Sequence, residues 1–126
     1  MIDLKDVLLI HKVLIDKFSG IKGVRDKAAL ESAINRPFAT FDQTELYPET
    51  IDKAAAVLES IIINHPFVDG NKRTGYVLMR FVLLKDNLDI EASQVDKYNF
   101  IIAISKGEMT FEMIKNWLVE NVTQKK

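Results

Sequence analysis

Apolar residues recur along this chain at intervals of three and four positions, which is the spacing of one face of an α-helix. The clearest stripe lies near the N-terminus and consists of Leu4, Val7, Leu8, His11, Leu14, Ile15 and Phe18. This pattern predicts a first helix from about Asp3 to Phe18, and Gly20 and Gly23 then open a loop. We interpret His11 as a hydrogen-bonded core residue, because that is the usual role of a single histidine on an apolar stripe.

Two more helices are predicted before the middle of the chain. Asp26 can cap a helix that ends after Arg36, because Pro37 disfavours helical backbone in the residue before it. Thr50 can cap a third helix, whose stripe of alanine, leucine and isoleucine residues continues until Pro66 breaks it.

The most apolar stretch of the sequence, Gly75 to Leu84, lies within a fourth predicted helix that runs from about Lys72 to Asp86. This helix is apolar nearly all round, so we expect it to be buried at the centre of the fold. Asn87 ends it.

Two helices are predicted in the last third of the chain. Ser93 can cap the fifth, which Gly107 closes, and Thr110 can cap the sixth. The tail from Thr123 to Lys126 is expected to be frayed.

The stretch from Phe38 to Pro48 lacks a helical stripe and is predicted to be an extended or flexible flap. No strand pattern reaches a useful length, so the predicted fold class is all-α. We expect about six helices around a buried central helix, with the flap placed before the loop at residues 65–73. The length of 126 residues fits one domain over residues 1–126.

Composition narrows the possible functions. Seventeen basic and eighteen acidic residues nearly cancel, so no overall field favours direct binding to nucleic acid or to a membrane surface. The chain has no cysteine, which excludes disulfides and thiolate metal sites. The N-terminal residues lack the basic and continuous apolar regions of a signal peptide, and no apolar run is long enough to cross a bilayer. We therefore expect a cytoplasmic protein.

Candidate chemistry is concentrated in the segment from His65 to Arg73, which joins the third and fourth predicted helices. Gly70 allows a sharp turn, and the first N–H groups of the fourth helix have no partner within that helix. These groups and the helix dipole make an anion site, to which Lys72 and Arg73 add positive charge. The segment is therefore predicted to bind phosphate.

Two further side chains suit the transfer of a phosphate group. Asp69 can hold Mg²⁺, which bridges phosphates with few protein ligands. Histidine is the side-chain type that most often acts as a general base at neutral pH, and His65 supplies one in this segment. Taken singly, the same residues would be a core histidine, a polar turn and a solvated first helical turn.

The sequence from His65 to Gly75, HPFVDGNKRTG, resembles the signature of the Fic/Doc family, H-P-F-x-[D/E]-G-N-G-R-x-x-R. Lys72 stands where typical Fic enzymes have glycine, and Tyr76 stands where they have a second arginine. Both departures resemble the death-on-curing (Doc) branch, as do the stretches 20–37 and 47–50. The resemblance covers about residues 4–90.

The resemblance implies a role for each matching position. His65 would be the general base, Asp69 would hold Mg²⁺, and Pro66 and Phe67 would anchor the loop. The residues that would bind the nucleotide phosphates are Gly70, Asn71, Lys72, Arg73 and Thr74. The flap residues that would position the target segment, by strand pairing, are Phe38, Ala39, Thr40, Phe41 and Tyr47.

The Doc branch lacks the second arginine, binds ATP in the opposite sense and transfers the γ-phosphoryl group to a threonine of elongation factor Tu. The resemblance therefore implies an ATP- and Mg²⁺-dependent protein kinase that acts as the toxin of a type II toxin–antitoxin system and stops translation. The chain lacks the inhibitory motif [S/T]-x-x-x-E-[G/N], so inhibition would come in trans from a Phd-like antitoxin. Two alternatives stay open: a Fic-type AMP transferase and a non-enzymatic protein-binding module.

Overall fold

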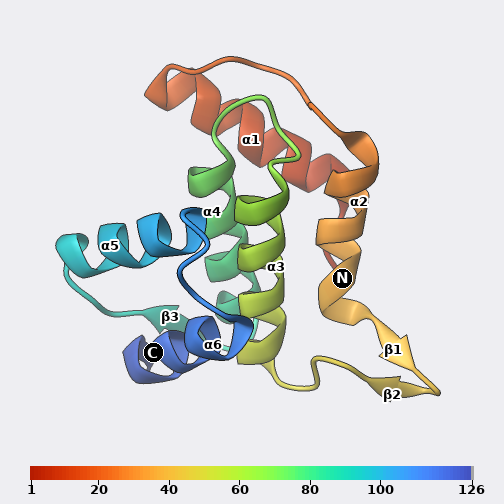
Figure 1. Ribbon diagram of the computed structural model, residues 1–126, viewed down its shortest axis with the longest axis vertical. Coiled ribbons are helices and arrows are strands. Elements are labelled where there is room, and N and C mark those ends of the chain that lie inside the picture. Colours follow the sequence, from red (N-terminus) through yellow and green to blue (C-terminus); the bar gives the residue numbers. More distant parts are fainter. Residues whose placement is uncertain (126) are drawn as a thin grey trace.

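A computed structural model describes residues 1–125, and over this range it confirms the predicted all-α fold with six α-helices. The helices are α1 (Leu4–Phe18), α2 (Lys27–Asn35), α3 (Thr50–Asn64), α4 (Asn71–Leu84), α5 (Gln94–Ser105) and α6 (Phe111–Asn121), with a short 3-10 helix η1 (Arg36–Phe38). The strands are β1 (Thr40–Phe41), β2 (Thr44–Glu45), β3 (Leu88–Ile90) and β4 (Val122–Gln124). Figure 1 shows α3 and α4 side by side, with α1 crossing near the loop that joins them.

The helix at the centre of the core is α3 rather than the predicted α4. All residues from Ala54 to Leu58 are completely buried, because α2, α4, α5 and α6 all pack against α3. The run of alanine side chains lets these neighbours approach closely. In α4, by contrast, Phe81 is 39% exposed and Leu84 is 36% exposed. The prediction that α4 is the buried central helix, which rested on its apolar composition, was therefore wrong.

The predicted helix caps are confirmed at three of four positions. The side chains of Asp26, Ser93 and Thr110 each accept a hydrogen bond from the backbone N–H three residues later. The prediction for α3 was wrong by one residue, since its cap is Glu49, whose N–H donates to the Asp52 carboxylate at 3.2 Å. Thr50 is already the first helical residue.

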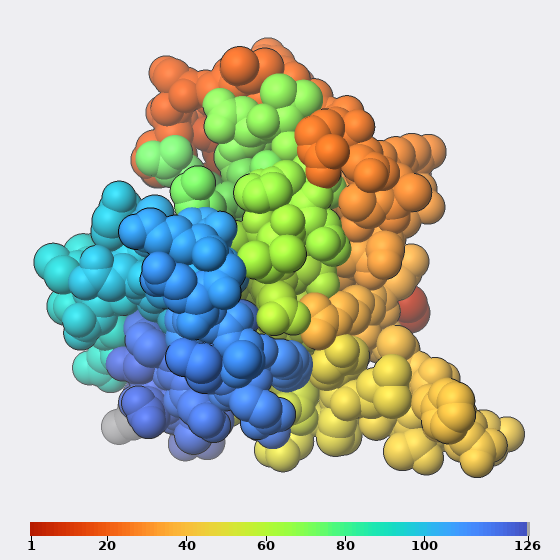
Figure 2. Space-filling model, in the orientation of Figure 1, coloured from red at the N-terminus to blue at the C-terminus, as the bar shows by residue number. Residues whose placement is uncertain are grey.

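The flap is an antiparallel hairpin that projects from the body of the protein (Figure 2). Thr40 pairs with Glu45 and Phe41 pairs with Thr44. The two residues between the strands both have positive φ angles of 51° and 65°, as in the tight turns that suit the twist of a hairpin. The predicted extended flap is thus confirmed.

The expectation of a frayed C-terminal tail was wrong for Thr123 and Gln124. They lie in β4, which pairs with β3 in antiparallel register, Ile90 opposite Val122 and Leu88 opposite Gln124. The N–H of Lys125 continues this pairing by donating to the Asn87 carbonyl at 2.7 Å. A three-residue strand has too few positions to show alternation, so only the tertiary structure reveals the pairing. The predicted fraying of Lys126 lies outside the described residues.

No helix within residues 1–125 has the combined length and apolarity that crossing a membrane requires.

An ion pair ties the β3–β4 ribbon to α4. Arg80 donates to both carboxylate oxygens of Asp89, Nε to Oδ1 at 2.8 Å and Nη2 to Oδ2 at 2.7 Å. These hydrogen bonds lower the pKa of Asp89 from 3.8 to about 2. Because the folded-state pKa lies below the unfolded one, the stabilisation is complete above pH 4 and is lost as the pH falls towards 2.

We predict that Asp89→Asn lowers the free energy of unfolding at pH 7 by about 1 to 2 kcal/mol. This figure is the free energy that corresponds to the pKa shift of Asp89, made smaller because solvent around the partly exposed Arg80 weakens the ion pair. The difference in the free energy of unfolding between parent and variant, measured by urea titration, should become smaller as the pH falls from 4 to 2. Asp16→Asn, at an exposed pair with Lys22, serves as the matched control and should change stability little. A constant difference across this pH range would contradict the prediction.

Candidate active site

The loop between α3 and α4 reverses the chain through two residues with left-handed backbone. His65, directly after α3, has φ 48° and ψ 57°, and Gly70, directly before α4, has φ 77° and ψ 17°. Glycine adopts this conformation freely, whereas histidine does so at a cost of about 1 kcal/mol. Between them, Pro66 and Phe67 are buried and anchor the loop in the core.

Arg25 offsets the cost at His65. Its guanidinium donates to two carbonyl oxygens at the end of α3, Nε to His65 and Nη2 to Asn64, both at 2.6 Å. These are carbonyl groups that a helix end leaves without partners. No local pattern in the sequence predicts this interaction, since 39 and 40 residues separate the partners.

The backbone after α1 also pairs with the loop. The N–H groups of Arg25 and Asp26 both donate to the Pro66 carbonyl, at 2.8 and 3.0 Å, and the N–H of Val68 donates to the Gly23 carbonyl at 3.0 Å. The segment from Gly23 to Asp26 therefore pairs with the loop through an isolated antiparallel bridge between Val24 and Phe67.

The side chain of His65 is exposed at the end of α3. Its main chain is held in place by Arg25, which bonds its carbonyl oxygen. This arrangement suits a group that must meet a hydroxyl from another molecule.

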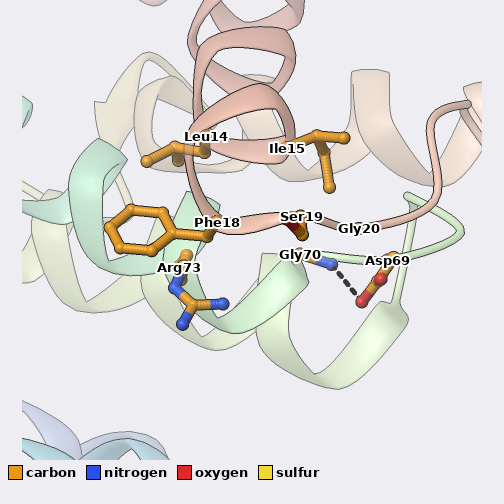
Figure 3. Close-up of a pocket in the computed structure, with 8 residues that line it drawn as sticks. All are labelled: Leu14, Ile15, Phe18, Ser19, Gly20, Asp69, Gly70 and Arg73. Atoms are coloured by element: carbon orange, nitrogen blue, oxygen red, sulfur yellow. Dashed lines mark hydrogen bonds between the residues drawn. The ribbon is translucent and has the colours of Figure 1, made fainter.

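The carboxylate of Asp69 is held by two backbone N–H groups. Ile21 donates to Oδ2 at 3.1 Å and Gly70 donates to Oδ1 at 2.8 Å, the second bond being drawn in Figure 3. These two bonds, with a smaller contribution from Lys72 and Arg73, hold the pKa of Asp69 below its ordinary value. The group is thus a carboxylate on an exposed residue, ready to accept a cation.

The first turn of α4 presents unpaired donors beside this carboxylate. Thr74 is the first residue whose N–H finds an acceptor within the helix, the Gly70 carbonyl at 2.9 Å. The N–H groups of Asn71, Lys72 and Arg73 therefore have no acceptor inside α4. The side chains of Lys72 and Arg73 are exposed beside them, so this helix end has the donors and the positive charge that typically attract an anion.

A small pocket lies at this end of the helix (Figure 3). Its volume is about 30 Å³, which matches one water molecule. The residues that line it are Leu14, Ile15, Phe18, Ser19, Gly20, Asp69, Gly70 and Arg73. The Arg73 guanidinium lies 4.3 Å from the centre of the Phe18 ring, so a cation–π contact holds it at the pocket mouth.

Three of the residues expected to bind phosphate are otherwise engaged. The Asn71 side chain is buried, and it both donates to the Phe67 carbonyl and accepts from the Phe67 N–H, each at 2.9 Å. The N–H of Gly70 is bonded to Asp69. Thr74 has no exposed surface, and its N–H donates to the Gly70 carbonyl at 2.9 Å. What is left for an anion is the backbone of residues 71–73 and the side chains of Lys72 and Arg73.

The predicted flap residues fall into two groups. Phe38, Ala39 and Thr40 line an open groove of about 810 Å³ that extends along α3 to Asn64, next to His65. Phe41 is 75% exposed on the hairpin. The tip of the hairpin lies at the opposite end of α3 from the loop (Figure 1).

Tyr47 is part of the base of the flap rather than of its binding edge. Its hydroxyl accepts from Arg36 Nε at 2.9 Å, and its ring stacks on Phe111 with 5.4 Å between centroids. Arg36 also bonds Glu59 and Ser60 of α3, both at 2.9 Å. This network fixes where the flap leaves the core, whereas the sequence pattern around Arg36 indicated only the end of a helix.

Comparison with known proteins agrees with the motif. Residues 1–83 match the model of the Fic/DOC family. A similar relative is Toxin Doc from Mycolicibacterium smegmatis (strain ATCC 700084 / mc(2)155), 44% identical over 75 residues, which are 60% of this chain and 55% of that protein. The match thus spans little more than half the length of the relative. Because the family match covers more than half of this chain and includes the whole loop, the chain belongs to the Fic/DOC family, and within it is similar to the Doc branch.

Proposed function

We propose that this protein is a Doc-like toxin that transfers the γ-phosphoryl group of ATP to a threonine hydroxyl of a translation factor such as elongation factor Tu. One observation carries the proposal: a single loop presents an exposed imidazole, a cation-ready carboxylate and an anion-binding helix end. The similarity to a protein named Toxin Doc supports the assignment.

The phosphates of the nucleotide would lie at the N-terminus of α4. The free N–H groups of residues 71–73 would donate to phosphate oxygens, and Lys72 and Arg73 would neutralise their charge. Arg73 can donate two parallel hydrogen bonds to one phosphate group, which fixes its orientation as well as its position.

The carboxylate of Asp69 fits a Mg²⁺ ion bound in the manner of nucleotide enzymes. Residues 1–125 contain no cluster of three or more His, Cys, Asp or Glu side chains that could hold a metal ion alone. Mg²⁺ commonly needs only one or two carboxylates, with waters and phosphates completing its shell. When held by Asp69, the ion would supply positive charge that neutralises the charge of the phosphates.

His65 would act as the general base. Its imidazole would take the proton of the target hydroxyl, whose oxygen then forms the new bond to the γ-phosphorus. The bond between that phosphorus and the β–γ bridging oxygen breaks, and ADP leaves. The exposure of His65 supports this role, because a hydroxyl from another molecule has to reach its ring.

The environment of Tyr76 favours phosphoryl transfer over AMP transfer. A phenol carries no positive charge in either protonation state, and burial raises the pKa of this half-buried one, so Tyr76 is neutral where Fic enzymes have their second arginine. The nearby cation, Arg80, is engaged by Asp89 at 2.7 and 2.8 Å. The second turn of α4 therefore lacks the cation that holds ATP in the Fic orientation.

The target segment would lie in the groove between the flap and α3. A helix of 15 residues is about 22 Å long, so an extended segment that reaches from β1 to His65 needs about six or seven residues. Inhibition would come in trans from a Phd-like antitoxin, and an AMP transferase is the alternative outcome of the first experiment below.

Incubation with Mg²⁺, elongation factor Tu and ATP labelled at either the α- or the γ-phosphate distinguishes the two reactions. We expect label to reach the target only from the γ position, because Tyr76 replaces the second arginine. Transfer only from the α position would show an AMP transferase instead. The variant Tyr76→Arg, assayed with the same two labels, tests whether this position controls the choice.

Expression in a bacterial host tests whether the loop chemistry causes toxicity. We expect His65→Ala and Asp69→Ala each to relieve growth arrest, with transfer reduced by at least about 100-fold, the usual scale for losing a general base. Glu108→Ala, an exposed residue between α5 and α6, is the control and should arrest growth like the parent. If both loop variants still arrested growth, a non-enzymatic binding module would be the better explanation.

A further inference from the structure

His11 of α1 contacts the candidate active-site loop at two points, although it lies more than 50 residues away in sequence. Its Nε2 is 2.8 Å from the Asp69 carbonyl oxygen. Its ring stacks on Phe67 with 3.8 Å between centroids and 7° between planes. Only 5% of its surface is exposed, so both contacts are shielded from water.

The hydrogen bond to Asp69 requires a proton on Nε2 of His11. A carbonyl oxygen can only accept, so Nε2 must carry a proton and donate it to Asp69. The parallel stack on Phe67 fixes the plane of the ring. The direction of the N–H bond is therefore set by packing, and the position of the Asp69 carbonyl follows from it.

The peptide unit between Asp69 and Gly70 is held at both of its polar ends. Its carbonyl oxygen accepts from His11, and its N–H donates to the carboxylate of Asp69 at 2.8 Å. A rotation of this peptide would break both bonds together. It would also disturb Gly70, which packs so closely on α1 that a Cβ atom there would lie 3.1 Å from Ile15 Cδ1.

We propose that His11 is a positioning residue of the active site. By fixing the peptide between Asp69 and Gly70, it keeps the Asp69 carboxylate on the N–H groups of Ile21 and Gly70 and beside the first turn of α4. The effect on catalysis rests on the proposed function, whereas the effect on the loop does not. The competing explanation is that His11 only fills the core, as the apolar stripe of α1 suggested.

Three substitutions separate the two contacts of His11. His11→Phe keeps a flat ring against Phe67 and removes the donor. His11→Gln keeps an N–H donor at about the reach of Nε2, whereas His11→Asn has the same chemistry but is one carbon shorter. Val7→Ala, a completely buried position one turn earlier in α1, is the control for a loss of core packing.

The first measurement is amide hydrogen exchange at Gly70 and Ile21, the two donors to Asp69, under conditions where every variant is folded. We expect exchange at these two amides to become about tenfold faster in His11→Phe and His11→Asn and to stay near the parent rate in His11→Gln. Val7→Ala should lower the melting temperature without a selective change at these two amides. This measurement needs neither ATP nor a target.

The second measurement is phosphoryl transfer from ATP. We expect kcat/KM to fall about tenfold or more in the Phe and Asn variants, with rescue by Gln, and to be nearly unchanged in Val7→Ala. His11 would be only a core residue if His11→Gln and His11→Asn had the same kcat/KM. The same conclusion would follow if kcat/KM fell in step with the melting temperature across all four variants. A parent protein that transfers nothing would instead refute the proposed function, while the exchange rates would still decide the role of His11.

Discussion

The turn from α3 to α4 places every candidate catalytic group, and it depends on hydrogen bonds that come from outside the turn. Two residues with left-handed backbone, His65 and Gly70, reverse the chain within six positions. The Asn71 side chain closes this turn from within by bonding both backbone groups of Phe67. Without these bonds the buried polar groups of the loop would each cost about 1 to 3 kcal/mol.

The N-terminal quarter of the chain acts as the outer support of this turn. Arg25 bonds the carbonyl groups at the end of α3, Ile21 bonds the Asp69 carboxylate, and His11 bonds the Asp69 carbonyl. The His65 main chain, the Asp69 carboxylate and the Asp69 carbonyl are thus held by different parts of the N-terminal quarter. Bonds of this kind fix the geometry of the loop, while the residues His65, Asp69, Lys72 and Arg73 stay exposed.

The flap and the loop are linked through α3 rather than by direct contact. Arg36 joins the base of the flap to Glu59 and Ser60, one to two turns before His65. The groove lined by Phe38 to Thr40 ends at Asn64. The groove and the Arg36 network thus connect the base of the flap to the end of α3 that precedes His65.

Local chemistry in the sequence was enough to predict the helices, three of their four caps and the loop that carries the chemistry. Periodicity and capping act over three or four residues, and the family motif is contiguous, so both can be recognised in a single chain. The motif also marked His65 and Asp69, whose side chains the structure leaves exposed.

Only the tertiary structure decided which residues touch across the chain. Composition favoured α4 as the buried centre, but burial depends on how many neighbours pack around a helix, and α3 has the most. The buried positions of Asn71 and Thr74 follow from the direction in which α4 leaves the loop. The pairing of β4 with β3 and the bonds from His11 and Arg25 join residues far apart in sequence, and no local pattern encodes such contacts.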